Sequence, residues 1–134
     1  MIERLSAASN NTAFNEGYCL DFDGHGPQPG CERDYDVRWA PGTGRLVAGM
    51  GARLAAMGEL SQAAYDALDG AALQRITYDA ADVAVPATIR SAVAIRTANG
   101  HYIMLRRLDD GEAHRKYFFF QHVEFGPRSR APVP

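Results

Sequence analysis

Three β-type runs, separated by two turn signals, form the strongest hydrophobic pattern in the chain. They lie at residues 91–98, 101–108 and 116–125. The third run is rich in aromatic residues, and burying a single Phe contributes about 1.5–3 kcal/mol, so this run is expected inside a sheet. The pattern predicts a C-terminal three-stranded antiparallel meander.

The first turn signal is Asn99-Gly100, which tolerates the positive φ angles of a two-residue type I′ hairpin. Such a loop places Ile95 opposite Met104. One face of the hairpin then carries Val93, Ile95, Thr97, Tyr102 and Met104, and the other carries Ala94, His101, Ile103 and Leu105.

The N-terminal half predicts further strands. Alternating patterns favour strands in residues 13–23 and 34–39, with the Pro- and Gly-rich residues 24–30 as a loop between them. Residues 45–59 fit both a helical stripe and an alternating strand, and residues 52–57 favour the strand.

One short helix is predicted near residues 61–73. Ser61 is a good N-cap, and Gly70 weakens the helix enough to divide it into two turns. The fold class is therefore mainly β (α+β), an antiparallel sheet or sandwich with the C-terminal three-stranded meander and this helix.

Length and charge limit the function classes. The 134 residues fit one domain, 1–134, with a short helical or irregular N-terminal arm at 1–12 and a C-terminal tail at 126–134. A net charge of −2 argues against nucleic acid as a partner. No apolar window is long enough for a membrane span, and the first residues show no signal-peptide pattern.

A local basic cluster near the second hairpin consists of Arg106, Arg107, Arg115 and Lys116. We interpret it as a solvated hairpin end, with phosphate binding as the alternative.

Several short segments resemble a known module. GYCLDFDG, DYDVRW, GARLAAMGE and AVAIRTANGHYIMLR are similar, in this order, to a module of predicted secreted bacterial proteins and more distantly to the HmuY-type β-domains of haemophores. The resemblance covers residues 16–107. It implies a β-domain fold, a secreted or cell-surface location and, for the haemophore branch, haem as ligand. Met104 stands where the module has a lysine.

The segment Asp21 to Glu32 half matches a calcium-binding loop. Asp21 and Asp23 alternate before a Gly, and Glu32 closes a twelve-residue window. His25 replaces an oxygen ligand and two prolines follow, so an EF-hand is not expected. A looser calcium site and a polar loop that bonds its own backbone both remain open.

Cys19 and Cys31 flank the same loop. A disulfide between them would contribute about 3 kcal/mol by restricting the unfolded chain. Two reduced thiols are the alternative.

His101 and His122 are candidate ligands of a transition metal or haem iron. If the second hairpin loop places Leu108 opposite Arg115, the two histidines face one another across adjacent strands. Tyr102, Met104 and Phe120 would then supply apolar walls. A change of one residue in the loop removes the pairing.

No catalytic motif accompanies these residues, so the sequence favours a non-enzymatic binding or assembly module acting through its sheet surface, edges or loops. A haem or metal carrier is the second hypothesis, and a small enzyme the third. Trp39 and Tyr102 are candidate interface residues for a protein partner or for self-assembly. The alternation Tyr35, Val37, Trp39 also predicts that Trp39 lies in the core, beside Phe118 or Phe120.

Overall fold

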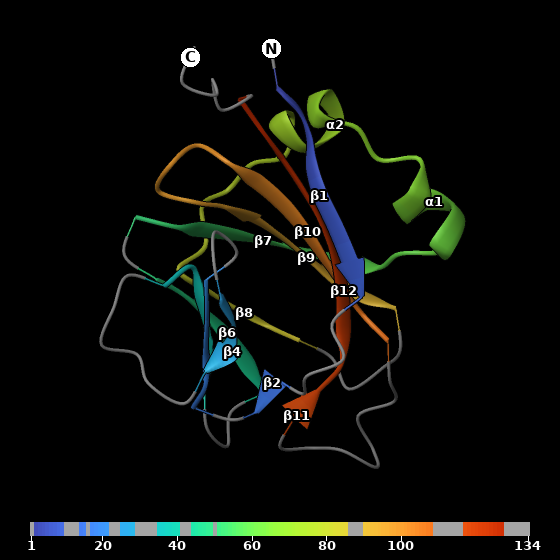
Figure 1. Ribbon diagram of the computed structural model, residues 1–134. Helices are drawn as coiled ribbons and strands as arrows, with labels where there is room; N and C mark the ends of the chain where they lie inside the picture. The colour runs from blue at the N-terminus through green and yellow to red at the C-terminus, as the bar shows by residue number, and fades with distance from the viewer. Residues whose placement is uncertain are drawn as a thin grey trace, which may run out of the picture.

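The described residues form two five-stranded antiparallel β-sheets, one two-stranded pairing and two short helices (Figure 1). The computed structural model describes residues 2–9, 14–15, 17–21, 25–28, 35–40, 44–49, 51–85, 90–108 and 117–127. The predicted fold class, mainly β with a small helical part, is confirmed.

The first sheet has five strands in the order β1-β12-β10-β9-β7. Their bounds are Glu3–Ser9 (β1), Phe120–Gly126 (β12), Tyr102–Arg107 (β10), Ser91–Arg96 (β9) and Arg53–Glu59 (β7). β9, β10 and β12 are the predicted meander, and β12 lies inside the sheet as expected. The prediction of a short helical or irregular N-terminal arm is wrong for residues 3–9, which form β1. They pair with backbone groups that β12 would otherwise leave unpaired.

The second sheet has the order β4-β3-β5-β6-β8. Its strands are His25–Gln28 (β4), Cys19–Asp21 (β3), Val37–Trp39 (β5), Arg45–Ala48 (β6) and Asp82–Ala84 (β8). The predicted loop at 24–30 is wrong for residues 25–28. β4 is an edge strand, and an edge tolerates proline because one side of its backbone has no partner strand.

Two small pairings connect the margins of the sheets. Leu54 of β7 forms an isolated bridge with Ala80, just before β8. On the other side, β2 (Phe14–Asn15) pairs with β11 (Tyr117–Phe118). The predicted strand at 13–23 is thus divided into β2 and β3.

The β9–β10 hairpin turns through three residues, Ala98 to Gly100. The N–H of Thr97 donates to the C=O of His101 at 2.9 Å, and the N–H of Gly100 donates to the C=O of Thr97 at 3.1 Å. Gly100 has a φ of +80°, and Asn99 is not among the described residues with positive φ. This is the three-residue loop that ends in a left-handed glycine, so the predicted type I′ turn is wrong.

The additional loop residue shifts the hairpin register by one position. Ile103, not Met104, lies opposite Ile95. A shift of one residue exchanges the faces of one strand relative to the other. The predicted faces are therefore wrong: Ile103 and Leu105 share a face with Ile95, while Tyr102 and Met104 lie on the opposite face.

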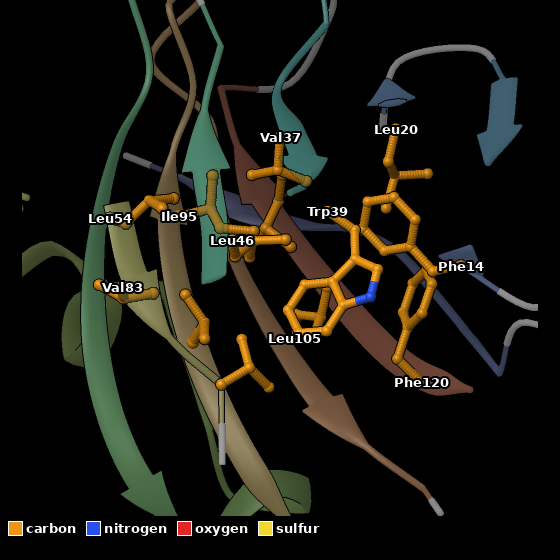
Figure 2. Packing of buried hydrophobic residues seen from close by; sticks show 13 residues of the cluster. Phe14, Leu20, Val37, Trp39, Leu46, Leu54, Val83, Ile95, Leu105 and Phe120 are labelled. Carbon is orange, nitrogen blue, oxygen red and sulfur yellow. The ribbon is translucent and has the colours of Figure 1, made fainter. Parts of the chain in front are cut away.

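The inner face of the first sheet packs against the second sheet. Figure 2 shows Trp39 of β5 beside Leu105 of β10, with the rings of Phe14 and Phe120 next to it. The buried cluster between the sheets contains Phe14, Leu20, Val37, Trp39, Leu46, Leu54, Val83, Val85, Val93, Ile95, Ile103, Leu105 and Phe120. This inner core holds the single tryptophan and the two largest fully buried side chains of the described residues, those of Phe14 and Phe120.

The outer face of the first sheet packs against helices α1 (Gln62–Asp66) and α2 (Gly70–Gln74) (Figure 1). The outer core contains Tyr65, Leu73, Tyr78, Ala92, Ala94, Met104, Val123 and Phe125.

The predicted helix consists of two, each with its own N-cap. Ser61 Oγ accepts from the Ala64 N–H at 3.1 Å, as predicted, and Asp69 Oδ1 accepts from the Ala72 N–H at 2.7 Å. Gly70 is the first residue of α2, and a side chain has little space there because a Cβ would lie 2.5 Å from Cγ1 of Ile2. Gly70 is therefore a contact point with the chain just before β1, besides weakening a continuous helix.

Candidate functional site

The predicted calcium window, residues 21–32, contains the β3–β4 hairpin. Asp21 is half-buried at the end of β3 and pairs with His25 of β4. Residues 25–28 in a ladder cannot wrap around an ion as an EF-hand loop does. Asp23 and Glu32 lie outside the described residues, so a looser calcium site stays a prediction.

Cys19 is buried in β3, and no free cysteine occurs among the described residues. Cys31 lies outside the described residues. The Cys19–Cys31 bond therefore stays a prediction.

The predicted cross-strand pair of His101 and His122 is wrong. His122 lies opposite Leu105, four residues along β10 from His101, which is about 13 Å at the usual strand rise. Tyr102 and Met104 face the outer core, whereas Phe120 faces the inner core, so these side chains do not enclose one site. The described residues do not fit a haem or metal ion held by both histidines.

His122 is half-buried next to Phe120, with 6.1 Å between the ring centroids. Burial lowers its pKa from the usual 6.5, because the charged imidazolium is less well solvated there.

The two candidate interface residues differ in their surroundings. Trp39 is only 3% exposed and packs in the inner core near Phe120, which confirms the core prediction and contradicts the interface role. Tyr102 is half-buried in the outer core, where its ring centroid lies 5.6 Å from that of Tyr78. Its interface role stays a prediction.

The structure pairs His101 with Glu124 at the hairpin end of the first sheet. His101 Nδ1 lies 2.7 Å from Glu124 Oε2, and the side chains are 21% and 7% exposed, respectively. The His101 backbone N–H donates to Thr97 Oγ1 at 3.1 Å. A buried carboxylate thus fixes the orientation of a partly exposed imidazole. Glu124 was missed in the sequence, although a carboxylate inside an aromatic strand is itself a signal.

A β-bulge in β1 brings Leu5 to the same place. The register passes from Arg4–Phe125 to Ser6–Glu124, so Leu5 is the additional residue. At 37% exposure it is the exposed large hydrophobic side chain of the described residues. A Cβ on Gly126 would lie 2.8 Å from His101 Cδ2 and 3.0 Å from Leu5 Cδ1. Leu5, His101, Glu124 and Gly126 together are called the β1 corner below.

A second polar group lies on the outer face, around Arg106. Arg106 Nε donates to the C=O of Leu60 at 2.6 Å, and Arg106 Nη1 donates to Gln62 Oε1 at 3.1 Å. Gln121 Nε2 also donates to Gln62 Oε1, at 3.1 Å. Gln62 therefore joins α1 to two strands of the sheet.

The interpretation of Arg106 and Arg107 as a solvated hairpin end is wrong. They are 6% and 2% exposed. Both are in β10, where successive side chains point to opposite faces of the sheet. Arg115 and Lys116 lie outside the described residues.

Tyr65 of α1 lies close to this group. Burial raises the pKa of its phenol to about 12; Arg4 and Arg106 act against the rise, and Asp66 adds to it. The phenol is therefore neutral at physiological pH.

In the described part of the chain, no three or more His, Cys, Asp or Glu side chains gather as a metal site. Among the described helices, none has the length and apolar character to cross a membrane.

No protein-family model matches the chain, and neither a curated protein nor a solved structure matches it. The HmuY-type resemblance therefore stays an expectation from short motifs.

Proposed function

We propose that this chain is a non-enzymatic β-rich binding module that assembles with a second copy through the outer edge of β1, with which no other described strand pairs. The observation that carries the proposal is the exposed Leu5 on a bulge of this strand. An apolar side chain of this size, on the edge strand of a sheet, is typical of a surface that another strand covers.

The two edges of the first sheet differ. The β7 edge is partly covered, because Leu54 exchanges backbone hydrogen bonds with Ala80. β1 stands at the end of the strand order with β12 on one side. After the bulge, its residues 6–9 are small and uncharged (SAAS), so they lack the charges that usually protect an edge from pairing.

A second copy supplies a matching strand. Two β1 edges can pair antiparallel about a two-fold axis, because each presents the same backbone groups. Leu5 would become buried in this pairing, and His101, held by Glu124, would contribute a polar contact beside it.

The test is to measure the molecular mass in solution of the wild type, Leu5→Lys and Ala56→Lys over a wide range of protein concentrations. Ala56→Lys places the same charge on β7, the opposite edge, at an exposed position. We expect wild type and Ala56→Lys to associate equally. Leu5→Lys should dissociate at least about tenfold more readily, since burying a Leu contributes about 1.5–3 kcal/mol.

A monomer at every concentration would contradict assembly, and equal association of all three would contradict its location. A Soret band in the freshly purified protein would instead support the haem-carrier hypothesis.

A further inference from the structure

Two exposed arginines lie directly opposite one another on the outer face of the first sheet. Arg53, the first residue of β7, pairs with Arg96, the last residue of β9, on neighbouring strands (Figure 1). The next pair on the same face, Ala55 and Ala94, packs in the outer core, so both arginines emerge on this side. Directly opposite residues have Cβ atoms about 4.5–5.5 Å apart, and like charges there are destabilising. The ladder therefore holds two positive charges side by side.

The two charges are not neutralised within the described part of the chain. No ion pair there joins an acidic side chain to Arg53 or Arg96. Asp79, the acid that precedes the bridge residue Ala80, does not form one with them either. Arg53 Nη1 donates to the C=O of Ala52 at 2.7 Å, and this acceptor is neutral. The other N–H groups of the Arg53 guanidinium can therefore serve an additional acceptor.

Two tyrosine rings hold Arg96 in place. Its guanidinium carbon lies 5.8 Å from the ring centroid of Tyr78, a cation–π contact. Tyr102 lies opposite Arg96 on β10, and its ring centroid lies 5.6 Å from that of Tyr78. The Tyr78 hydroxyl donates to the C=O of Leu73 at 2.8 Å, which fixes the ring. The cation–π contact does not use the N–H donors of Arg96, so they remain for an oxygen acceptor.

The tyrosine beneath Arg96 does not balance its charge. Burial raises the pKa of Tyr78 above its usual value, and the neighbouring Tyr102 adds to the rise, whereas Arg96 acts against it. The phenol is therefore neutral at physiological pH. A charge that balances the two arginines has to come from a ligand.

We propose that Arg53 and Arg96 together bind a dianionic phosphate group. Two guanidinium groups match its two negative charges, and each can donate two N–H groups to neighbouring phosphate oxygens. Tyr78 is a positioning residue, because its fixed ring holds Arg96 on the outer face. Binding would relieve the repulsion between the arginines. The inference is independent of the proposed assembly, because β10 and β12 separate β9 from β1.

The test is a titration of the folded protein with sodium phosphate, methyl phosphate and, separately, sodium acetate at about pH 7.5, where phosphate groups are mostly dianionic. Sodium chloride keeps the ionic strength constant. The readout is the NMR position of the backbone amide signals of β7 and β9. Arg53→Gln and Arg96→Gln each remove one cation.

Arg4→Gln is the matched control. Arg4 is also exposed, and the register Arg4–Phe125–Tyr102–Arg96 places it on the same face of the sheet, three strands from Arg96. The variant therefore removes the same charge from the protein without removing a member of the arginine pair.

We expect saturable shifts with phosphate in the wild type and in Arg4→Gln, with the same affinity. Arg53→Gln and Arg96→Gln should each bind roughly ten- to hundredfold more weakly, the range for losing a hydrogen bond to a charged group. Acetate, a monoanion, should bind more weakly than phosphate. Saturation by methyl phosphate as well supports a phosphate monoester as ligand, and saturation by inorganic phosphate alone supports the free ion.

Shifts that grow without saturation, equal affinity in all variants, or equal affinity for acetate and phosphate would overturn the proposal. If Arg96→Gln does not fold, Arg53→Gln decides alone, because that side chain contacts only a neighbouring carbonyl in the described part of the chain. Leu5→Lys should bind phosphate like the wild type, so failure of the assembly proposal remains distinguishable.

Discussion

The inner face of the first sheet packs against another sheet, whereas its outer face packs against two helices of five residues each. The inner core is built from large apolar side chains, including Trp39, Phe14 and Phe120. In the outer core, β9 contributes only the small side chains of Ala92 and Ala94. The margin of this core holds the polar residues Gln62, Arg106 and Gln121. The inner face should therefore determine global stability, and the outer face should be able to open locally.

The largest effect is expected for Trp39→Ala. Removing this ring from the inner core should lower the free energy of unfolding by about 3–5 kcal/mol. Chemical denaturation followed by far-UV circular dichroism measures the loss. Trp39→Phe, which keeps an aromatic ring, should cost less; a loss below 1 kcal/mol for Trp39→Ala would contradict the central role of this ring.

Leu73→Ala tests the outer core. Leu73 is fully buried on α2, so its truncation should cost about 2–3 kcal/mol, the lower part of the range for buried Leu. Hydrogen exchange should show faster exchange in α1 and α2 than in β9 and β10. Equal loss of protection in helices and strands would mean that the two faces unfold as one unit.

Gln62→Ala tests the polar margin. Gln62 accepts hydrogen bonds from both Arg106 and Gln121, so its loss leaves buried donors unsatisfied. We expect a cost of about 1–3 kcal/mol. Gln74→Ala, at an exposed position of α2, is the control and should change stability by less than about 0.5 kcal/mol. Equal stability of the two variants would argue against the network.

The smallest effect concerns His122 and pH. Burial lowers its pKa in the folded state, so below pH 6.5 the unfolded chain binds a proton that the folded chain does not. Stability should therefore fall as the pH falls through 6.5 toward the folded pKa. His122→Gln should lose this part of the pH dependence in denaturation curves at several pH values. If the pH dependence of stability is the same in His122→Gln and the wild type, a group other than His122 causes it.

The sequence predicted the existence of strands better than their contacts. Alternation and aromatic content were sufficient for β9, β10 and β12, because both are local properties. The loop length between Thr97 and His101 was not determined locally, since Asn99-Gly100 suits both a two-residue and a three-residue turn. That single residue exchanged the faces of β10 relative to β9. The predicted histidine pair failed separately, because the register of β10 with β12 places Leu105, not His101, opposite His122.

The candidate sites were less predictable than the fold for the same reason. The β1 corner depends on a bulge in β1 and on its pairing with β12, and both are long-range features. The Arg106 group depends on α1 folding onto the sheet. The core position of Trp39 was predicted correctly, because its burial follows from strand alternation alone.

The pairing of β1 with β12 has a consequence for synthesis on the ribosome. Glu3 pairs with Gly126, so the partner of the first strand is made 123 residues later (126 − 3). β1 must wait as an extended, unsatisfied segment while the rest of the first sheet emerges, and such delayed long-range pairing slows folding. If synthesis stops before Phe120, residues 3–9 should therefore lack their partner strand. They should then be accessible to chaperones or to another nascent chain.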